Sequence, residues 1–450
     1  IRAHQAIALA ARRRGDAAAA KEARQALLEI DPLHHFAYAE SLLAENQIGR
    51  QVDFTSLIRH ELPYQTYLEL AIDYVERGET SDAVRILELS PPHTLVDLWL
   101  AYLHQQGIPG TAWQDHLEEA LDKPADFVFP YRPETLAVLE WATQTDAHWK
   151  LNYYLALNYW GLGRLEEAAY FMEAVGDAPD YAPFYAARAD LLHQLSGRNP
   201  AGDLQRAMQL DPDEWRFPHR LVRHYLSEGH HDQALALAEK ATVDFPNNYS
   251  IGMDYAKALL EEGHYRRAIE TLNGLRVLPF EGASEGRQLY EQAHLGRALE
   301  QLEEGDHADA VRTLEASKQW PETLGVGKPY DVDERRQDYL LHLAYQGMGN
   351  AQKAEQFRKA VVHYTQEHAA GASMDHLLGL QLMAPEEAKA LIEKWEDEDR
   401  ELPAALQWVV AKYRHDPQAL GQLEMAPAHD ARFRSMAFEL LEQIAQAAPQ

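Results

Sequence analysis

The sequence predicts an all-α fold in which helical hairpins stack into a solenoid. The main observation is a glycine followed five positions later by an alanine, a pair that recurs along the chain. A second is a proline 15 to 17 residues beyond several of these glycines, and a third is that no long segment alternates between apolar and polar residues, as a half-buried strand would. The seven pairs are Gly15/Ala20, Gly78/Ala83, Gly163/Ala168, Gly229/Ala234, Gly263/Ala268, Gly305/Ala310 and Gly349/Ala354.

Each marker has a physical role in a helical hairpin. The glycine ends the first helix in a left-handed conformation, the alanine lies where the two helices cross closely, and the proline ends the second helix. Gly197 marks an eighth, weaker unit, in which Gly202 replaces the alanine. The intervals from Gly163 to Gly197 and from Gly229 to Gly263 are both 34 residues. The prolines are Pro32, Pro212, Pro246, Pro279 and Pro321.

This period and punctuation resemble the tetratricopeptide repeat. The first-helix pattern of aromatic, leucine, small and aromatic residues is also present, as in Tyr67, Leu70, Ala71 and Tyr74. The resemblance implies a tetratricopeptide-like α-solenoid, a right-handed superhelix of helical hairpins. It also implies a concave groove that binds a peptide segment or another domain, and hence a non-enzymatic protein–protein interaction scaffold.

The elements divide into four segments. Residues 1–62 hold one repeat and a degenerate helical pair, and residues 63–146 hold one repeat and a degenerate helical segment over 92–146. Residues 147–364 are regular repeats with insertions at 280–287 and 316–336. Residues 365–450 predict a C-terminal helical cap, with helices over 386–395 and 432–447, because an end repeat must cover its apolar face.

Charge and composition exclude several classes of protein. The 450 residues include 42 Lys and Arg against 71 Asp and Glu, a net charge of −29 that repels nucleic acid and anionic membrane surfaces. No apolar run approaches the ~20 residues of a membrane span, and the absence of cysteine removes disulfides and thiolate chemistry. Because Ile1 is not methionine, the N-terminus is expected to be truncated or processed. A cytoplasmic location is favoured, although the sequence does not fix the compartment.

Several separate motifs resemble a second, more specific family. The motifs are FVFPYR at 127–132, WKLNYY at 149–154, APFY at 182–185, LPFEGASEG at 278–286 and WPETLGVGKP at 320–329. They resemble long bacterial proteins in which a carbohydrate-type β-sandwich domain of unknown function precedes a tetratricopeptide region. This resemblance implies an alternative function, as a helical accessory region of a larger carbohydrate-active or carbohydrate-binding protein. The partner would then be a missing N-terminal domain of the same polypeptide.

No motif predicts catalysis, a cofactor or a metal site. Gly282–Gly286 matches the G-x-S-x-G pattern, but a nucleophile elbow needs a preceding strand, so Ser284 is expected in a loop before a helix. Gly325–Lys328 lacks the first glycine of a phosphate loop and is followed by Pro329. The 22 histidines include no H-E-x-x-H motif.

Two features predict a ligand groove. Aromatic residues concentrate between 127 and 185, and Arg216, Arg220 and Arg223 lie on one face of a helix at i, i+4 and i+7. The number of residues between a side chain and its repeat glycine determines the helix face on which it lies. By this register, further cations and aromatic residues are expected to face the groove. Because arginine binds carboxylates through two parallel hydrogen bonds, an acidic peptide segment is the expected ligand, unless these cations pair with acids of neighbouring repeats. The predicted groove residues are Lys150, Tyr153, Trp160, Arg216, His219, Arg220, Arg223 and Lys257.

Overall fold

The structure, a computed structural model, describes residues 1–45, 51–369, 371–398, 402–424 and 436–447. This described part contains helices and no strand. The chain folds as two compact units, Ile1–Asp211 and Pro212–Gln450. The boundary between them falls within the predicted run of regular repeats, 147–364.

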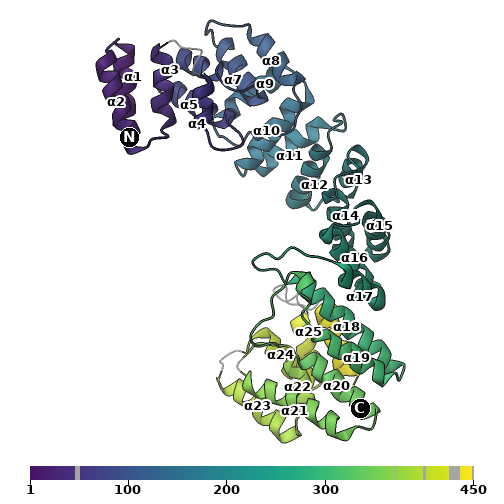
Figure 1. Cartoon of the computed structure of the whole chain (residues 1–450). Helices are drawn as coiled ribbons and strands as arrows, with labels where there is room; N and C mark the ends of the chain where they lie inside the picture. Colours follow the sequence, from purple (N-terminus) through teal and green to yellow (C-terminus); the bar gives the residue numbers. More distant parts are fainter. Residues whose placement is uncertain (46–50, 370, 399–401, 425–435, 448–450) are drawn as a thin grey trace. The chain divides into compact units, whose positions relative to one another are not determined.

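The first unit is a series of helices in which neighbours along the chain pack as antiparallel hairpins (Figure 1). The degenerate segment 92–146 contains three helices, α7 to α9, where the sequence indicates only irregular helical pairing. The helices are α1 (Arg2–Arg13), α2 (Ala17–Ile30), α3 (His35–Glu45), α4 (Gln51–Leu57), α5 (Tyr64–Glu76), α6 (Thr80–Leu87), α7 (Thr94–Gln105), α8 (Trp113–Asp122), α9 (Thr135–Thr145), α10 (Trp149–Gly161), α11 (Leu165–Val175), α12 (Ala182–Ser196) and α13 (Ala201–Leu210).

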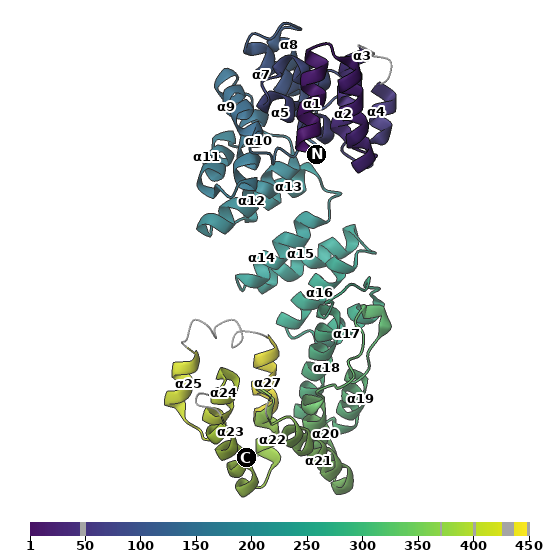
Figure 2. The same cartoon turned by 90° about the vertical axis from the view of Figure 1, so that its left-hand side faces the viewer.

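The second unit continues with hairpins and ends in a cluster of shorter helices (Figure 2). Its repeats comprise α14 (Arg216–Ser227), α15 (His231–Asp244), α16 (Tyr249–Glu261), α17 (Tyr265–Gly274), α18 (Glu285–Glu303), α19 (His307–Ser317), the 3-10 helix η2 (Glu322–Leu324), α20 (Arg335–Gly347) and α21 (Ala351–Glu367). The later helices are α22 (His376–Leu382), α23 (Pro385–Glu398), α24 (Ala404–Tyr413), α25 (Pro417–Glu424) and α27 (Met436–Gln446).

The glycine and alanine markers have the predicted conformations. All seven repeat glycines have positive φ, between 69° and 80°, and Gly197 does too. All seven paired alanines are buried, with no more than 3% of their surface exposed. A side chain larger than alanine at these positions would therefore separate the two helices of its hairpin.

The two insertions are shorter than predicted, and the second contacts the residues just before the first. Helix α18 begins at Glu285, inside the predicted insertion 280–287, and α19 extends to Ser317 while α20 begins at Arg335. The Val277 amide donates a hydrogen bond to the Thr323 carbonyl over 2.8 Å. Leu324 of η2 is fully buried in the core formed by α16, α17 and α18. One insertion therefore supplies core volume to a hairpin that precedes it in the chain.

The predicted C-terminal cap is present as α22, α23, α24 and α27, which share one hydrophobic core with α18, α20 and α21. Helix α27 lies beside α24, where the rings of Phe438 and Trp408 are 5.2 Å apart (Figure 2). The predicted helix 386–395 corresponds to α23, and the predicted helix 432–447 to α27, although residues 432–435 lie outside the described residues. These helices cover the apolar face that the last hairpin would otherwise expose.

Candidate binding site

The second unit contains a cavity of about 840 Å³ that is lined by the first helices of successive hairpins. Helices α14, α16, α18 and α20 all contribute, and Asp333 and Asp375 reach it from the residues that precede α20 and α22. Helices α14, α16 and α18 each contribute residues three or four positions apart, which share one helix face, and α20 contributes Arg336. The charged lining residues are Arg223, Lys257, Glu261, Glu285, Glu291, Asp333, Arg336 and Asp375.

The lining of this cavity is mixed in charge, whereas the sequence predicts a basic groove. Three cations face five carboxylates, so the cavity carries both signs with an excess of negative charge. Three uncharged polar side chains, Ser227, Gln288 and Gln292, also line it. Such a lining can pair with the polar backbone and with charged side chains of a polypeptide ligand.

Arg223 is the predicted groove cation with hydrogen bonds to two carboxylates of neighbouring hairpins. Its Nε donates to Asp254 Oδ1 over 3.2 Å, and its Nη2 donates to Glu285 Oε1 over 3.0 Å. Burial alone would lower the Arg223 pKa, but the carboxylates of Asp254 and Glu285 raise it above its ordinary value. His219 donates from Nδ1 to the second oxygen of Asp254 over 2.5 Å. Asp254 is buried, so the Arg223 guanidinium neutralises a charge inside the hairpin array and His219 adds a second hydrogen bond to the same carboxylate.

Lys257 and Glu261 lie one turn apart on α16, and both line the cavity. Within the described part of the chain, Lys257 has no hydrogen-bonded partner. Burial raises the pKa of the Glu261 carboxyl above its ordinary value, against the lowering effect of His231 and Lys257. The Nδ1 atom of His231 lies 4.0 Å from Glu261 Oε2. Glu261 is therefore a partly desolvated carboxylate whose charge is only partly compensated.

Arg216 and Arg220 lie on the same helix as Arg223 but do not line the cavity. Arg216 is exposed, pairs with Glu214 over 2.9 Å and lies over the Trp215 ring, with its Cζ atom 5.0 Å from the centroid. Arg220 is half-buried. Arg223 and Lys257 therefore line the cavity. His219 does not line it but bonds to Asp254, the partner of Arg223. Arg216 and Arg220 lie elsewhere on α14.

Two of the three predicted groove residues of the first unit, Lys150 and Tyr153, have local structural contacts. The Nζ atom of Lys150 donates to the carbonyls of Leu121 and Lys123, each over 2.6 Å, and so caps the C-terminal end of α8. Tyr153 is 6% exposed and its ring packs on Phe184, with centroids 5.5 Å apart. Trp160 is half-buried near the end of α10. Lys150 and Tyr153 therefore contribute to packing within this unit.

Arg336 and the five carboxylates of the cavity are not among the groove residues that the sequence predicts. Arg336 stands 13 residues before Gly349, the same register in which Lys150 and Arg216 precede their glycines, so extending the count to the last repeat would have found it. Glu261 stands two residues before Gly263. The acids were missed because only cations and aromatics were placed in register.

The two glycine-rich motifs have the predicted turn conformations. Ser284 precedes the first residue of α18 and follows an irregular segment, without the strand that a nucleophile elbow requires. Gly325 ends η2 in the left-handed conformation, with φ of 70°. Among the helices of the described residues, none has both the length and the apolar character needed to cross a bilayer.

Comparison with known proteins supports the repeat assignment. Residues 225–277 match the family model described as tetratricopeptide repeat. A segment of 156 residues is 29% identical to the antiviral innate immune response effector IFIT1 of Macaca fascicularis. This match covers 32% of the chain and 30% of that protein. The chain therefore aligns with less than a third of the relative's length.

Several solved structures match this chain at low sequence identity and with low TM-scores. The P58(IPK) TPR domain matches with 14% identity and a TM-score of 0.26, covering 92% of this chain and 97% of that one. The human IFIT1 dimer with PPP-AAAA matches with 15% identity and a TM-score of 0.27, covering 76% and 93%. PilF of Pseudomonas aeruginosa matches with 14% identity and a TM-score of 0.28, covering 48% and 91%. With the repeat match and the helical hairpins, the predicted fold class, an all-α tetratricopeptide-like α-solenoid with a C-terminal helical cap, is confirmed.

Proposed function

We propose that this protein is a non-enzymatic scaffold that binds a segment of another polypeptide in the cavity of its second unit. The observation that carries the proposal is the cavity itself, a concave surface of about 840 Å³ formed by the first helices of consecutive tetratricopeptide-like hairpins. A volume of this size accommodates a few side chains of a bound segment. Rigid helices with fixed charges can select such a segment by shape and by charge.

The distribution of charge indicates the chemistry of the ligand. Arg223 and Arg336 already pair with protein carboxylates, since Arg336 Nη2 lies 2.9 Å from Asp375 Oδ1. Lys257 is the lining cation best placed to accept a carboxylate of the ligand, as the predicted acidic segment requires. Glu261 lies one helical turn from Lys257, and its partly compensated negative charge favours a cationic group of the ligand at that position. The proposed ligand is therefore a segment that carries an acidic and a basic side chain close together.

A random peptide library displayed on phage provides the test, with the whole chain as the immobilised protein. We expect enriched peptides to contain both an acidic and a basic residue and to bind with micromolar affinity in calorimetry. Lys257→Glu should weaken their binding at least tenfold, because it replaces the ammonium that faces the ligand carboxylate with a like charge. Lys257 is preferred to Arg223 for this test because reversing Arg223 would leave the buried Asp254 carboxylate with only His219.

The matched control is Arg266→Glu, a charge reversal of the same kind on α17. Arg266 is 81% exposed and lies outside the cavity, so the enriched peptides should bind this variant as they bind the wild type. Circular dichroism should show equal helical content for all three proteins. Peptides that bind Lys257→Glu and wild type equally would place the binding surface elsewhere and refute the proposal.

The excess of carboxylates in the cavity also supports the expected absence of a nucleic-acid partner, because a phosphate backbone requires a basic surface. The two other partner hypotheses, a missing N-terminal domain and a larger carbohydrate-active or carbohydrate-binding protein, stay predictions from the family resemblance.

A further inference from the structure

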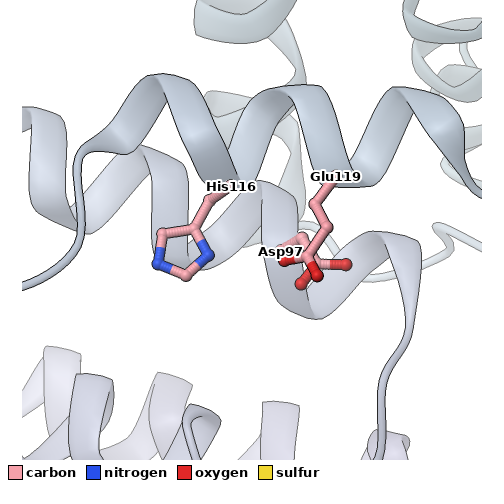
Figure 3. Close-up of side chains that lie close together, drawn as sticks. All are labelled: Asp97, His116 and Glu119. Atoms are coloured by element: carbon pink, nitrogen blue, oxygen red, sulfur yellow. The ribbon is translucent and has the colours of Figure 1, made fainter.

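A histidine and two carboxylates meet in the hairpin formed by α7 and α8 of the first unit. Asp97 lies on α7, and His116 and Glu119 lie on α8 (Figure 3). One potential ligand atom from each residue lies within 4.8 Å of the other two. The cluster belongs to neither the cavity of the second unit nor the predicted groove residues.

The local structure explains why these side chains converge. His116 and Glu119 are three residues apart, so both project from the same face of α8 toward α7 (Figure 3). Asp97 is 7% exposed and reaches them from the first turn of α7. A buried carboxylate from one helix therefore faces an i, i+3 pair of ligand-type residues on its partner.

His116 lacks the hydrogen bonds that a structural histidine normally makes. Both of its ring nitrogens are shielded from solvent, and neither has a hydrogen-bond partner in the described part of the chain. The ring stacks on that of His104, with centroids 5.3 Å apart and planes 5° apart. Buried polar atoms are rarely left without partners, so an imidazole held in this way indicates a group that the protein atoms do not supply.

The chemistry of the three residues favours a transition-metal ion. Imidazole nitrogen and carboxylate oxygen together suit Zn²⁺ and its first-row neighbours. A tetrahedral zinc ion with ligands at about 2.0–2.2 Å would hold the ligand atoms about 3.4 Å apart, a separation that small side-chain rotations can reach from the present arrangement. The fourth position would be open to water.

In the present structure the Lys123 ammonium pairs with the Asp97 carboxylate, which a metal ion would also need. Its Nζ atom lies 2.7 Å from Asp97 Oδ2 and neutralises that carboxylate. A lysine side chain is long and flexible, so it can leave the carboxylate at moderate cost when a doubly charged ion binds. The ammonium and a metal ion would therefore compete for the same oxygen.

We propose that Asp97, His116 and Glu119 form a binding site for one divalent transition-metal ion of the zinc class, with Lys123 as its competitor. The site joins α7 to α8, so an ion there would stabilise this hairpin. The three ligands come from two helices, so no single linear motif of the sequence contains them.

Titration of the chelator-treated whole chain with ZnCl₂, followed by calorimetry, tests the proposal. The wild type should bind one equivalent tightly, and His116→Gln and Glu119→Gln should each weaken that equivalent at least tenfold. Glu118→Gln, an exposed acid beside Glu119 on the same helix, should bind like the wild type. Lys123→Gln should bind at least threefold more tightly, because it removes the competing ammonium.

Cobalt substitution gives a second readout that does not depend on heats of binding. Co²⁺ in the wild type should show visible absorption of a low-coordinate nitrogen and oxygen site, and His116→Gln should lose it. Equal helical content by circular dichroism should establish that each variant is folded. A wild type without a tight equivalent, or a His116→Gln variant that titrates like Glu118→Gln, would overturn the proposal and leave only weak surface histidines as zinc ligands.

Discussion

His376 and Arg335 show how single residues set the stability of the second unit. The His376 side chain is fully buried, its Nδ1 accepts a hydrogen bond from Arg335 Nη1 over 2.7 Å, and its Nε2 donates to the Gly371 carbonyl over 2.7 Å. This pattern requires a neutral ring, because a proton on Nδ1 would face a guanidinium. Burial, and then the charge of Arg335, lower the pKa of His376 to about 4, although Asp333 and Asp375 oppose the shift.

The lowered pKa of His376 predicts a loss of stability in mild acid. An unfolded histidine titrates near pH 6.5, so between about pH 6.5 and 4 the unfolded chain binds a proton that the folded chain does not. The contribution of this residue is therefore complete above pH 6.5 and falls as the pH decreases toward 4, by up to about 3 kcal/mol. Urea unfolding at several pH values, for wild type and His376→Asn, measures it.

The variant cannot titrate at this position, so its stability should fall less steeply than that of the wild type between pH 6.5 and 4.5. Other groups titrate in the same range, but they are common to both proteins and cancel in the difference. Parallel curves for the two proteins would mean that folding does not lower the pKa of His376.

At the scale of helices, the sequence predicts the hairpins well and their insertions less well. A left-handed glycine and a buried alanine are local requirements, so their spacing alone places seven hairpin turns. The burial of Leu324 depends instead on a contact between the second insertion and the residues just before the first, the hydrogen bond from the Val277 amide to the Thr323 carbonyl. No periodicity records such a contact, so 316–336 was interpreted only as an interruption.

The sequence likewise predicts part of the candidate site, namely the residues whose position depends on helical register alone. Helical register directs Arg223 and Lys257 to the cavity, because it depends only on distance from the repeat glycine. The pairing of Arg223 with Asp254 and Glu285 depends on the distance between three successive hairpins. The excess of carboxylates in the cavity therefore emerged only from the structure.

Leu324 predicts a measurable contribution of the second insertion to the fold. Leu324→Ala should lower the free energy of unfolding by about 2–5 kcal/mol, because it leaves a void in the core of α16, α17 and α18. Leu278→Ala is the control, since Leu278 lies just before the first insertion with 67% of its surface exposed and should change the stability by less than about 0.5 kcal/mol. Urea unfolding measures both, and equal effects would show that η2 contributes no core packing.

At the scale of the whole molecule, stability is distributed over separate cores. In the second unit, one core joins α18, α20 and α21 to the cap, and another joins α14, α15 and α16. In a repeat array each hairpin contacts mainly its neighbours, so the effect of a core substitution decreases with distance along the array. The cap therefore stabilises the end of the array locally, and its loss should destabilise the hairpins next to it first.

Trp408 of α24 tests this locality. The residue is fully buried in the core of the cap, and Trp408→Ala should remove about 3–5 kcal/mol of packing. Hydrogen exchange of the whole chain should then become faster in α20, α22, α24 and α27, while α14 and α15, which belong to a different core, should keep the wild-type rates. Faster exchange of equal size in α14 and α15 would instead show that the second unit unfolds as one cooperative block, because damage to the cap would then reach every hairpin of that unit.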